Sequence, residues 1–300
     1  MLNGGRMKPE LNKAIGHKKA QKHLLLAHKY EKKYKKNKKQ INLILCLSNL
    51  GFYHHCLAVL SNDLNHANQK INHYTQAAKT FEKITKLDSK PKFEAYTNQY
   101  LGYSSVVNAG TAQNNPNKLD YYKKASTHFS KAAALFGKAK MHGDNLLCKG
   151  WTNLTKSCAF DVQAASETNT QKRIKLSKKV HKSAIEAHKI FTVLKVNKLK
   201  KRTKSLEFAS KAWITILQGK NPEKAIKLFE KASKCISNVR EWKLAALFLQ
   251  GLSQWFLGVY SANPKTAKKS FLNAAKLFKE CNSNEMAINS LSMIQTRGLK

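Results

Sequence analysis

A short pattern recurs along this chain: a small residue is followed, three or four positions later, by phenylalanine or tyrosine. In a helix this spacing puts both side chains on one face, so each occurrence marks a helix with an apolar stripe. A unit repeated in this way buries its stripe by stacking on its neighbours. The chain is therefore predicted to be an array of paired helices. The aromatic anchors are Tyr30, Phe81, Phe136, Phe191, Phe229 and Phe278.

Residues 74–102 show the repeated unit most clearly. Small and apolar residues, ending with Phe81 and Ile84, recur there at three- and four-residue steps, which predicts one helix. The pair beginning at Asp88 breaks the pattern, and Pro91 follows where the first turn of a new helix tolerates proline. The stretch is thus expected to form two helices joined by a tight turn.

The segment AAKTFEKITKLDSKPKFEAYTNQYLG at 77–102 resembles the tetratricopeptide (TPR) repeat: one second helix, an Asp-containing turn and the next first helix. NPEKAIKLFEKASK at 221–234 resembles the same second helix. The resemblance implies an all-α fold, a right-handed α-solenoid of about six antiparallel hairpins, and a scaffold for binding other proteins. Successive anchors lie 51, 55, 55, 38 and 49 residues apart. TPR repeats have about 34 residues, so the longer helices of SNAP-like arrays fit better.

The expected organisation is a flexible basic tail over 1–8 and one TPR-like solenoid over 9–300. Polar, turn-rich segments near 111–117 and 166–170 are candidate subdivisions. The basic run at 194–204 is expected to be a turn. In the first helix the core-facing residues are expected to be Ile15, Leu24, Leu25, Ala27 and Tyr30.

The charge is extreme, with 55 Lys and Arg against 17 Asp and Glu and a net charge of +38. AT-rich coding would explain many lysines but not the shortage of acids. Such a field repels copies of the chain, which favours a monomer, and it favours a polyanionic partner. Only five of these bases are arginine. Because lysine reads little from base edges, we expect salt-sensitive contacts with a phosphate backbone.

Three basic runs are the candidate binding segments, at 31–39, 172–182 and 194–204. For the first run, a helix end whose cations complement the helix dipole is an equally good interpretation. The candidate polyanion-binding residues are Lys32, Lys33, Lys35, Lys36, Lys38, Lys39, Lys172, Arg173, Lys175, Lys178, Lys179, Lys182, Lys198, Lys200, Lys201, Arg202 and Lys204.

Residues 41–60 carry no formal charge and are long enough to cross a bilayer. Polar residues interrupt them, so a buried hairpin partner for the first helix is favoured. His54, His55 and Cys56 stand together, but adjacent residues point about 100° apart on a helix, so no metal site is expected. The six cysteines lack paired spacing, which favours free thiols in a reducing cytoplasm, or a nucleus if the source is eukaryotic.

No glycine-rich phosphate loop, H-E-x-x-H or G-x-S-x-G sequence occurs, so neither an enzyme activity nor a cofactor is expected. Three functions stay open. The first is a non-catalytic solenoid that binds a polyanion, with RNA or a ribonucleoprotein favoured. The second is a protein-interaction scaffold that binds a helix or an acidic segment. The third and least favoured is an adaptor on an anionic membrane surface.

Overall fold

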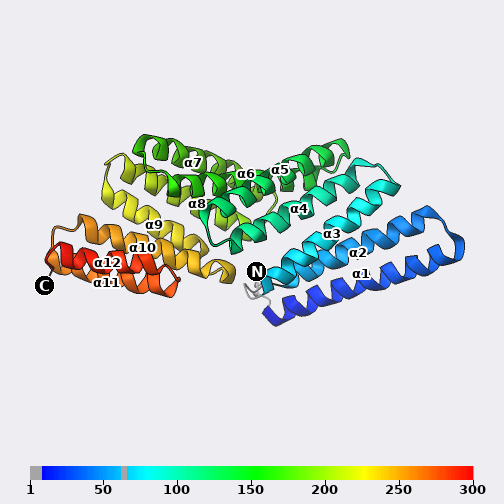
Figure 1. Ribbon diagram of the computed structural model, residues 1–300, viewed down its shortest axis with the longest axis horizontal. Helices are drawn as coiled ribbons and strands as arrows, with labels where there is room; N and C mark the ends of the chain where they lie inside the picture. Colours follow the sequence, from blue (N-terminus) through cyan, green and yellow to red (C-terminus); the bar gives the residue numbers. More distant parts are fainter. Residues whose placement is uncertain (1–8, 62–65, 300) are drawn as a thin grey trace, which may run out of the picture. The chain divides into compact units, whose positions relative to one another are not determined.

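The computed structural model describes residues 9–61 and 66–299, and within them it contains helices and no strand (Figure 1). The predicted tail at 1–8 lies outside the described residues. The α-helices are α1 (Pro9–Asn37), α2 (Gln40–Leu60), α3 (Ala67–Leu87), α4 (Pro91–Thr111), α5 (Asn115–Lys138), α6 (His142–Ser166), α7 (Thr170–Val193), α8 (Asn197–Leu217), α9 (Pro222–Ile236), α10 (Lys243–Tyr260), α11 (Pro264–Glu280) and α12 (Asn284–Thr296), with the short 3₁₀ helix η2 (Arg240–Trp242) before α10.

The chain divides into two compact units, unit 1 ending at Thr155 and unit 2 beginning at Lys156, within α6. The segment 111–117 lies inside unit 1 and the segment 166–170 inside unit 2. That residues 9–300 act as a single solenoid stays a prediction.

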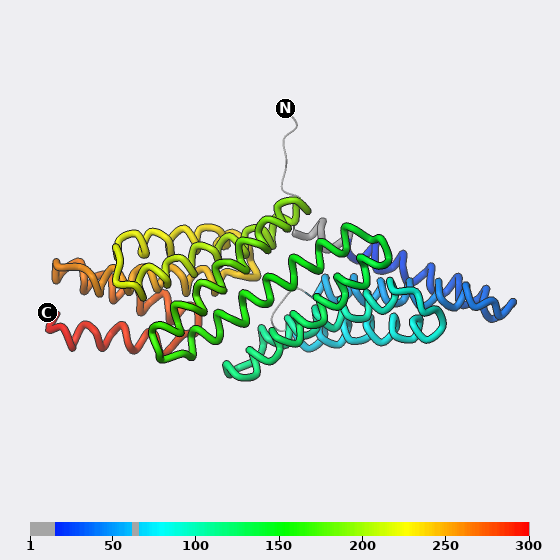
Figure 2. The backbone as a smooth tube through the Cα atoms, turned by 90° about the horizontal axis from the view of Figure 1, so that it is seen from above, coloured from blue at the N-terminus to red at the C-terminus, as the bar shows by residue number. Residues whose placement is uncertain are grey.

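Helices that follow one another in the chain pack side by side within each unit. In unit 1 these neighbours run from α1 to α5, and in unit 2 from α7 to α12. The backbone trace in Figure 2 shows successive helices running back and forth. Contacts that run mainly between sequence neighbours are the mark of a solenoid, so the predicted all-α solenoid is confirmed.

The small–aromatic seam of unit 1 depends on glycine. Phe81 of α3 is fully buried, and a Cβ added to Gly51 of α2 would overlap its ring. Likewise, a Cβ at Gly102 of α4 would come 2.8 Å from the ring of Phe129 in α5. At both positions the absence of a side chain lets an aromatic ring reach the neighbouring helix backbone. The sequence pattern therefore does form the core.

Unit 2 contains a seam of the same kind and, in addition, hydrogen bonds from buried serines between helices. Added Cβ atoms at Gly251 and Gly258 of α10 would come 2.7 Å and 2.8 Å from the rings of Phe278 and Phe271 in α11. Between other helix pairs, buried serines bond across instead: Ser205 Oγ donates to the Ala232 carbonyl at 2.8 Å. Five of the six predicted anchors are fully buried, namely Phe81, Phe136, Phe191, Phe229 and Phe278.

Several helices begin at asparagine, often followed by proline. The Asn221 side chain accepts a hydrogen bond from the Lys224 amide at 2.9 Å, and Asn263 accepts one from Thr266 at 3.1 Å. Pro222 follows the first of these caps, where a missing N–H has no cost. These caps fix the residue at which each helix starts, and therefore which side of the helix each of its lysines lies on.

Two expectations were wrong. Of the expected turn at 194–204, only the first three residues lie outside a helix, with Lys195 at φ 55°, because α8 begins at Asn197. The run contains good helix formers and neither Gly nor Pro, so charge alone did not break the helix. Leu25, expected in the core, is 63% exposed, and Tyr30 is only half-buried.

Candidate polyanion-binding surfaces

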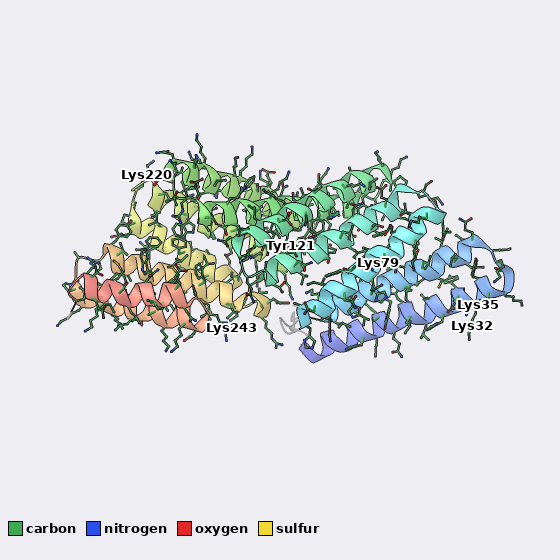
Figure 3. All side chains as sticks on the ribbon, viewed as in Figure 1. Lys32, Lys35, Lys79, Tyr121, Lys220 and Lys243 are labelled. Atoms are coloured by element: carbon green, nitrogen blue, oxygen red, sulfur yellow. The ribbon has the colours of Figure 1, made fainter. Side chains whose placement is uncertain are left out.

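The first predicted segment lies at the C-terminal end of α1 and in the turn to α2, and all six of its lysines are exposed. Figure 3 shows Lys32 and Lys35 at this end of the helix. Lys35 pairs with Glu31 at 2.7 Å, while Lys33 lies over the Tyr30 ring. The segment is a solvated cationic surface, as expected. Two of its lysines already interact with neighbouring side chains, one in an ion pair and one over an aromatic ring.

The second segment forms one continuous face of α7, which we call the α7 stripe: Lys172, Lys175, Lys178, Lys179 and Lys182, all exposed. Ile174, Ser177 and Val180 are buried on the opposite side. No Asp or Glu occurs between Glu167 and Glu186. The stripe extends for about 15 Å at 1.5 Å per residue. It is a row of like charges with no acid between its first and last members, and the next acid of the helix, Glu186, lies one turn beyond Lys182.

The third segment is engaged in contacts within unit 2. Lys198 Nζ lies 2.6 Å from Glu241, Lys201 Nζ donates to Asn238 Oδ1 at 3.0 Å, and Lys204 Nζ lies 3.0 Å from Glu207. Lys200, Lys201, Arg202 and Lys204 are all partly buried. The structure thus separates two runs that look alike in sequence: the α7 lysines face solvent, whereas most of the α8 bases bind neighbouring side chains.

Two arginines of unit 2 stack on tryptophans. The Arg173 guanidinium lies 4.8 Å from the ring centre of Trp213, and that of Arg202 lies 5.9 Å from the ring centre of Trp242. A stacked guanidinium keeps its N–H fork in a fixed plane, suited to a carboxylate or phosphate. These two predicted residues therefore differ in chemistry from the lysines around them.

An exposed carboxylate, Asp161 of α6, lies within electrostatic reach of both arginines. The surrounding protein limits its hydration and raises its pKa, and the charges of Arg202 and Arg173 oppose that rise. Because the side chain is still accessible to solvent, the group is available to a ligand. Unit 2 thus places both signs of charge beside two indole rings.

Charge is divided unequally between helices, a feature that reading basic runs alone had missed. Helix α2 contains no Lys, Arg, Asp or Glu, and α10 contains only Lys243. By contrast, α5, α7, α9 and α11 each carry several lysines on exposed positions. The lysines therefore follow particular helix faces rather than being spread evenly over the chain.

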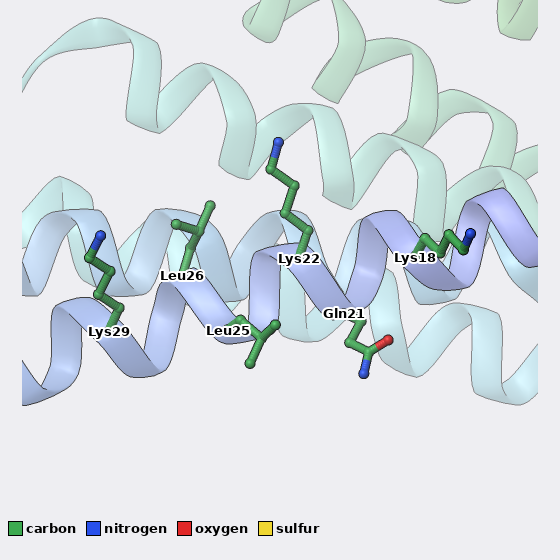
Figure 4. Close-up of a pocket in the computed structure, with 6 residues that line it drawn as sticks. All are labelled: Lys18, Gln21, Lys22, Leu25, Leu26 and Lys29. Carbon is green, nitrogen blue, oxygen red and sulfur yellow. The ribbon is translucent and has the colours of Figure 1, made fainter.

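A second cationic face, on α1, was also missed. Lys18, Lys22 and Lys29 are exposed and, with Gln21, Leu25 and Leu26, line an open groove of about 350 Å³ (Figure 4). Their four- and three-residue spacing with Leu25 was visible in the sequence. It was overlooked because Leu25 was assigned to the core.

The histidines of α2 and α3 lie close to one another. Among the described residues, no group of three or more His, Cys, Asp or Glu is placed to hold a metal ion. His54 and His73 lie with their Nδ1 atoms 3.4 Å apart, and burial lowers the pKa of both. Burial also lowers the pKa of His55 to about 4. The three groups therefore favour the neutral form near pH 7.

Helix α2 packs between α1 and α3, as expected for a hairpin partner, but it is not the buried helix that was expected, because only Asn42, Ile44, Gly51 and Ala58 are buried. Of the described helices it is the one that is long and apolar enough to cross a membrane, and 17% of its most apolar window is buried. Length and composition alone make this weak support for a membrane span.

Comparison with family models finds no match, and comparison with curated proteins finds none. Among solved structures, the crystal structure of BtubC (BKLC) from P. vanneervenii aligns over 94% of this chain and 90% of that chain, with 10% identity and a TM-score of 0.35. A similarity at this level assigns neither family nor function. The TPR-like resemblance stays an interpretation of the sequence.

Proposed function

We propose that this protein is a non-catalytic helical-repeat scaffold that binds a polyanion, with RNA favoured, through the α7 stripe. The observation that carries the proposal is the row of five exposed lysines on one face of α7, uninterrupted by any acid. The helical-repeat fold supports the scaffold role. An α-helix holds such a row rigid, so several phosphates can be contacted together.

The chemistry of lysine sets what this face can read. An ammonium group is a strongly hydrated point charge, so it contacts phosphate oxygens without discriminating between bases. Contacts of this kind release condensed counterions, so affinity falls steeply with salt. Five contacts to a single strand predict a slope of log K against log salt of about −3.5.

The test measures binding of a 30-nucleotide single-stranded RNA between 50 and 300 mM salt by fluorescence anisotropy. The variant K172Q/K175Q/K178Q/K182Q should lose about 2.8 of that slope, because each removed contact contributes about 0.7. The matched control K198Q/K201Q/K204Q removes α8 bases that already bind neighbours, so it should change the slope little. No binding at 50 mM salt, or equal effects of the two variants, would reject the proposal.

A second candidate function is protein binding through the two arginine–tryptophan pairs. Trp and Arg are the residue types most enriched at protein-interface hot spots, and here they occur stacked beside an exposed carboxylate. An acidic peptide should then bind more weakly to R173Q/R202Q, while the RNA slope stays unchanged. A peptide that loses affinity only when the α7 lysines are replaced would argue against this candidate.

A reducing, cytoplasmic location is part of the proposal. None of the six cysteines, all of which lie within the described residues, forms a disulfide, and burial raises the pKa of the Cys148 thiol to about 12, which makes it unreactive. Fractionation of the source cells with a nuclease-treated control would test both location and partner. Recovery in an oxidising compartment would contradict this part of the proposal.

A further inference from the structure

The outer face of α1 combines charge with an exposed apolar residue. Lys18, Lys22, Leu25, Lys29, Lys32 and Lys36 follow one another at alternating steps of four and three residues, and all are exposed. We call this set the α1 stripe. Alternating steps of four and three keep side chains on one side of a helix, over about 27 Å here. Glu31 is the one acid between residues 16 and 37.

The inner face of α1 is already used. Ala20 and Ala27 are 3% and 5% exposed, and α1 packs on α2. Figure 1 shows α1 at the edge of unit 1, so its outer face carries no further helix of that unit. Leu25 on this outer face is 63% exposed. Leu25 therefore lies outside the contact between α1 and α2, in the middle of a cationic helix face.

The groove around Leu25 has the composition of a small interface. The exposed Leu25 is the apolar residue of this face, Leu26 points to the other side of the groove, and Lys18, Lys22 and Lys29 with Gln21 complete the lining, all from one helix (Figure 4). Interfaces place an apolar anchor at the centre and charges at the rim. The α7 stripe has lysine at the corresponding central positions and no exposed leucine.

The charge and the exposed leucine of the α1 stripe limit which kind of partner it can bind. A phosphate backbone gains nothing from covering a leucine, and a second copy of this chain would bring cations against cations. A bilayer requires a broad apolar face, whereas the apolar face of α1 is turned toward α2. A helix with acids on both sides of one apolar residue satisfies both the lysines and Leu25.

We propose that the α1 stripe docks an acidic amphipathic helix of another protein, with one apolar side chain of that helix seated on Leu25. The partner places Glu or Asp at three- and four-residue steps on either side of its apolar residue, in register with the lysines. This surface is separate from the α7 stripe, so it holds whether or not the chain binds RNA.

The probe is a synthetic 21-residue helical peptide with one central leucine, flanked by glutamates at alternating steps of four and three. Binding to the full chain is measured by fluorescence anisotropy at two salt concentrations. Leu25→Ser should weaken binding about tenfold or more, since a fully buried leucine is lost. K18Q/K22Q/K29Q should weaken binding and flatten its salt dependence. Replacing the peptide's own leucine with glutamine should match the Leu25→Ser loss.

Matched controls separate this proposal from the RNA proposal. The α7 variant K172Q/K175Q/K178Q/K182Q should bind the peptide as the unmodified chain does, and Leu25→Ser should bind RNA as before. Vesicles with 30% phosphatidylserine form a third arm. The proposal is overturned if the peptide does not bind, if Leu25→Ser has no effect on it, or if Leu25→Ser instead releases the chain from vesicles.

Discussion

Units 1 and 2 each contain an aromatic seam of the same kind, but the residues beside the seam differ. In unit 1 the aromatic seam is accompanied by His54, His55, His73 and His128, and burial lowers the pKa of each. In unit 2 it is accompanied by serine-to-carbonyl bonds and by arginines stacked on tryptophans. The seam therefore holds the helices, while the residues beside it are free to give each unit its own response to acid and to ligands.

The two cationic stripes differ in the same way. The α1 stripe of unit 1 is centred on an exposed leucine, whereas the α7 stripe of unit 2 is lysine throughout. Both have similar spacing and little neighbouring acid. Equal charge can thus serve different ligands, because an apolar centre rewards a partner that can cover it.

The largest expected effect tests whether the seam is equivalent in both units. Phe81→Ala and Phe278→Ala each remove a fully buried ring and should lower the free energy of unfolding by about 3–5 kcal/mol. Chemical denaturation followed by circular dichroism would measure both. A cost below about 1 kcal/mol for one of them would show that the seam is not shared.

The next largest effect is expected from acid, which should lower the free energy of unfolding through His55 of unit 1. The pKa of His55 is about 4 when folded and 6.5 in the unfolded chain, so the unfolded chain takes up the proton first as the pH falls. The contribution of the neutral imidazole to the free energy of unfolding is fully present above pH 6.5. It decreases by about 3 kcal/mol as the pH falls from 6.5 to 4.

Denaturation of the unmodified chain and of His55→Leu at pH 7.5 and pH 4.5 would measure this loss. The substitution should reduce the difference in unfolding free energy between the two pH values. An unchanged difference would mean that His55 does not titrate as its burial indicates.

A smaller effect tests the close approach at glycine. Gly51→Ala forces a methyl group against the buried Phe81 ring and should cost about 1–3 kcal/mol. Gly251→Ala in unit 2 should cost about the same, since Phe278 stands in its way. Gly110→Ala is the matched control, because nothing lies within 4 Å of its added Cβ. Thermal unfolding of the three variants would rank them, and equal midpoints would refute the argument.

The smallest effect concerns ion pairs. Lys204→Ala removes a half-buried pair with Glu207 and should cost about 0.2–1 kcal/mol, less at high salt. Lys35→Ala removes an exposed pair in unit 1 and should leave stability unchanged. Urea denaturation at 50 mM and 500 mM salt distinguishes the two. A larger loss for Lys35 would reverse this part of the comparison.

Much of the architecture was predictable because helical periodicity is local. The anchors Phe81 to Phe278 lie three or four residues from small residues, and all five phenylalanines are buried as predicted. The segment 194–204 failed because dense charge was interpreted as a turn, although charge does not stop a helix without Gly or Pro. The helix propensity of the residues in this segment, considered by itself, would have predicted the observed helix.

The candidate sites were predictable only in part. Every lysine of the α7 stripe was identified in advance, and its exposure follows from the phase of the buried Ile174 and Val180. The α8 bases look the same in sequence, yet Glu241 and Asn238, about 40 positions away, hold two of them. No local pattern reports such a partner.

Residue order was sufficient for the helices, their apolar stripes and the excess of positive charge, because each depends on neighbours within a few positions. Which lysines face water, and which leucine is left outside, depended on how whole helices meet. Leu24 and Leu25 are adjacent and about 100° apart on α1, so packing on α2 could cover only one side of the pair. Exposure depends on contacts distant in sequence, and those form only when the helices pack.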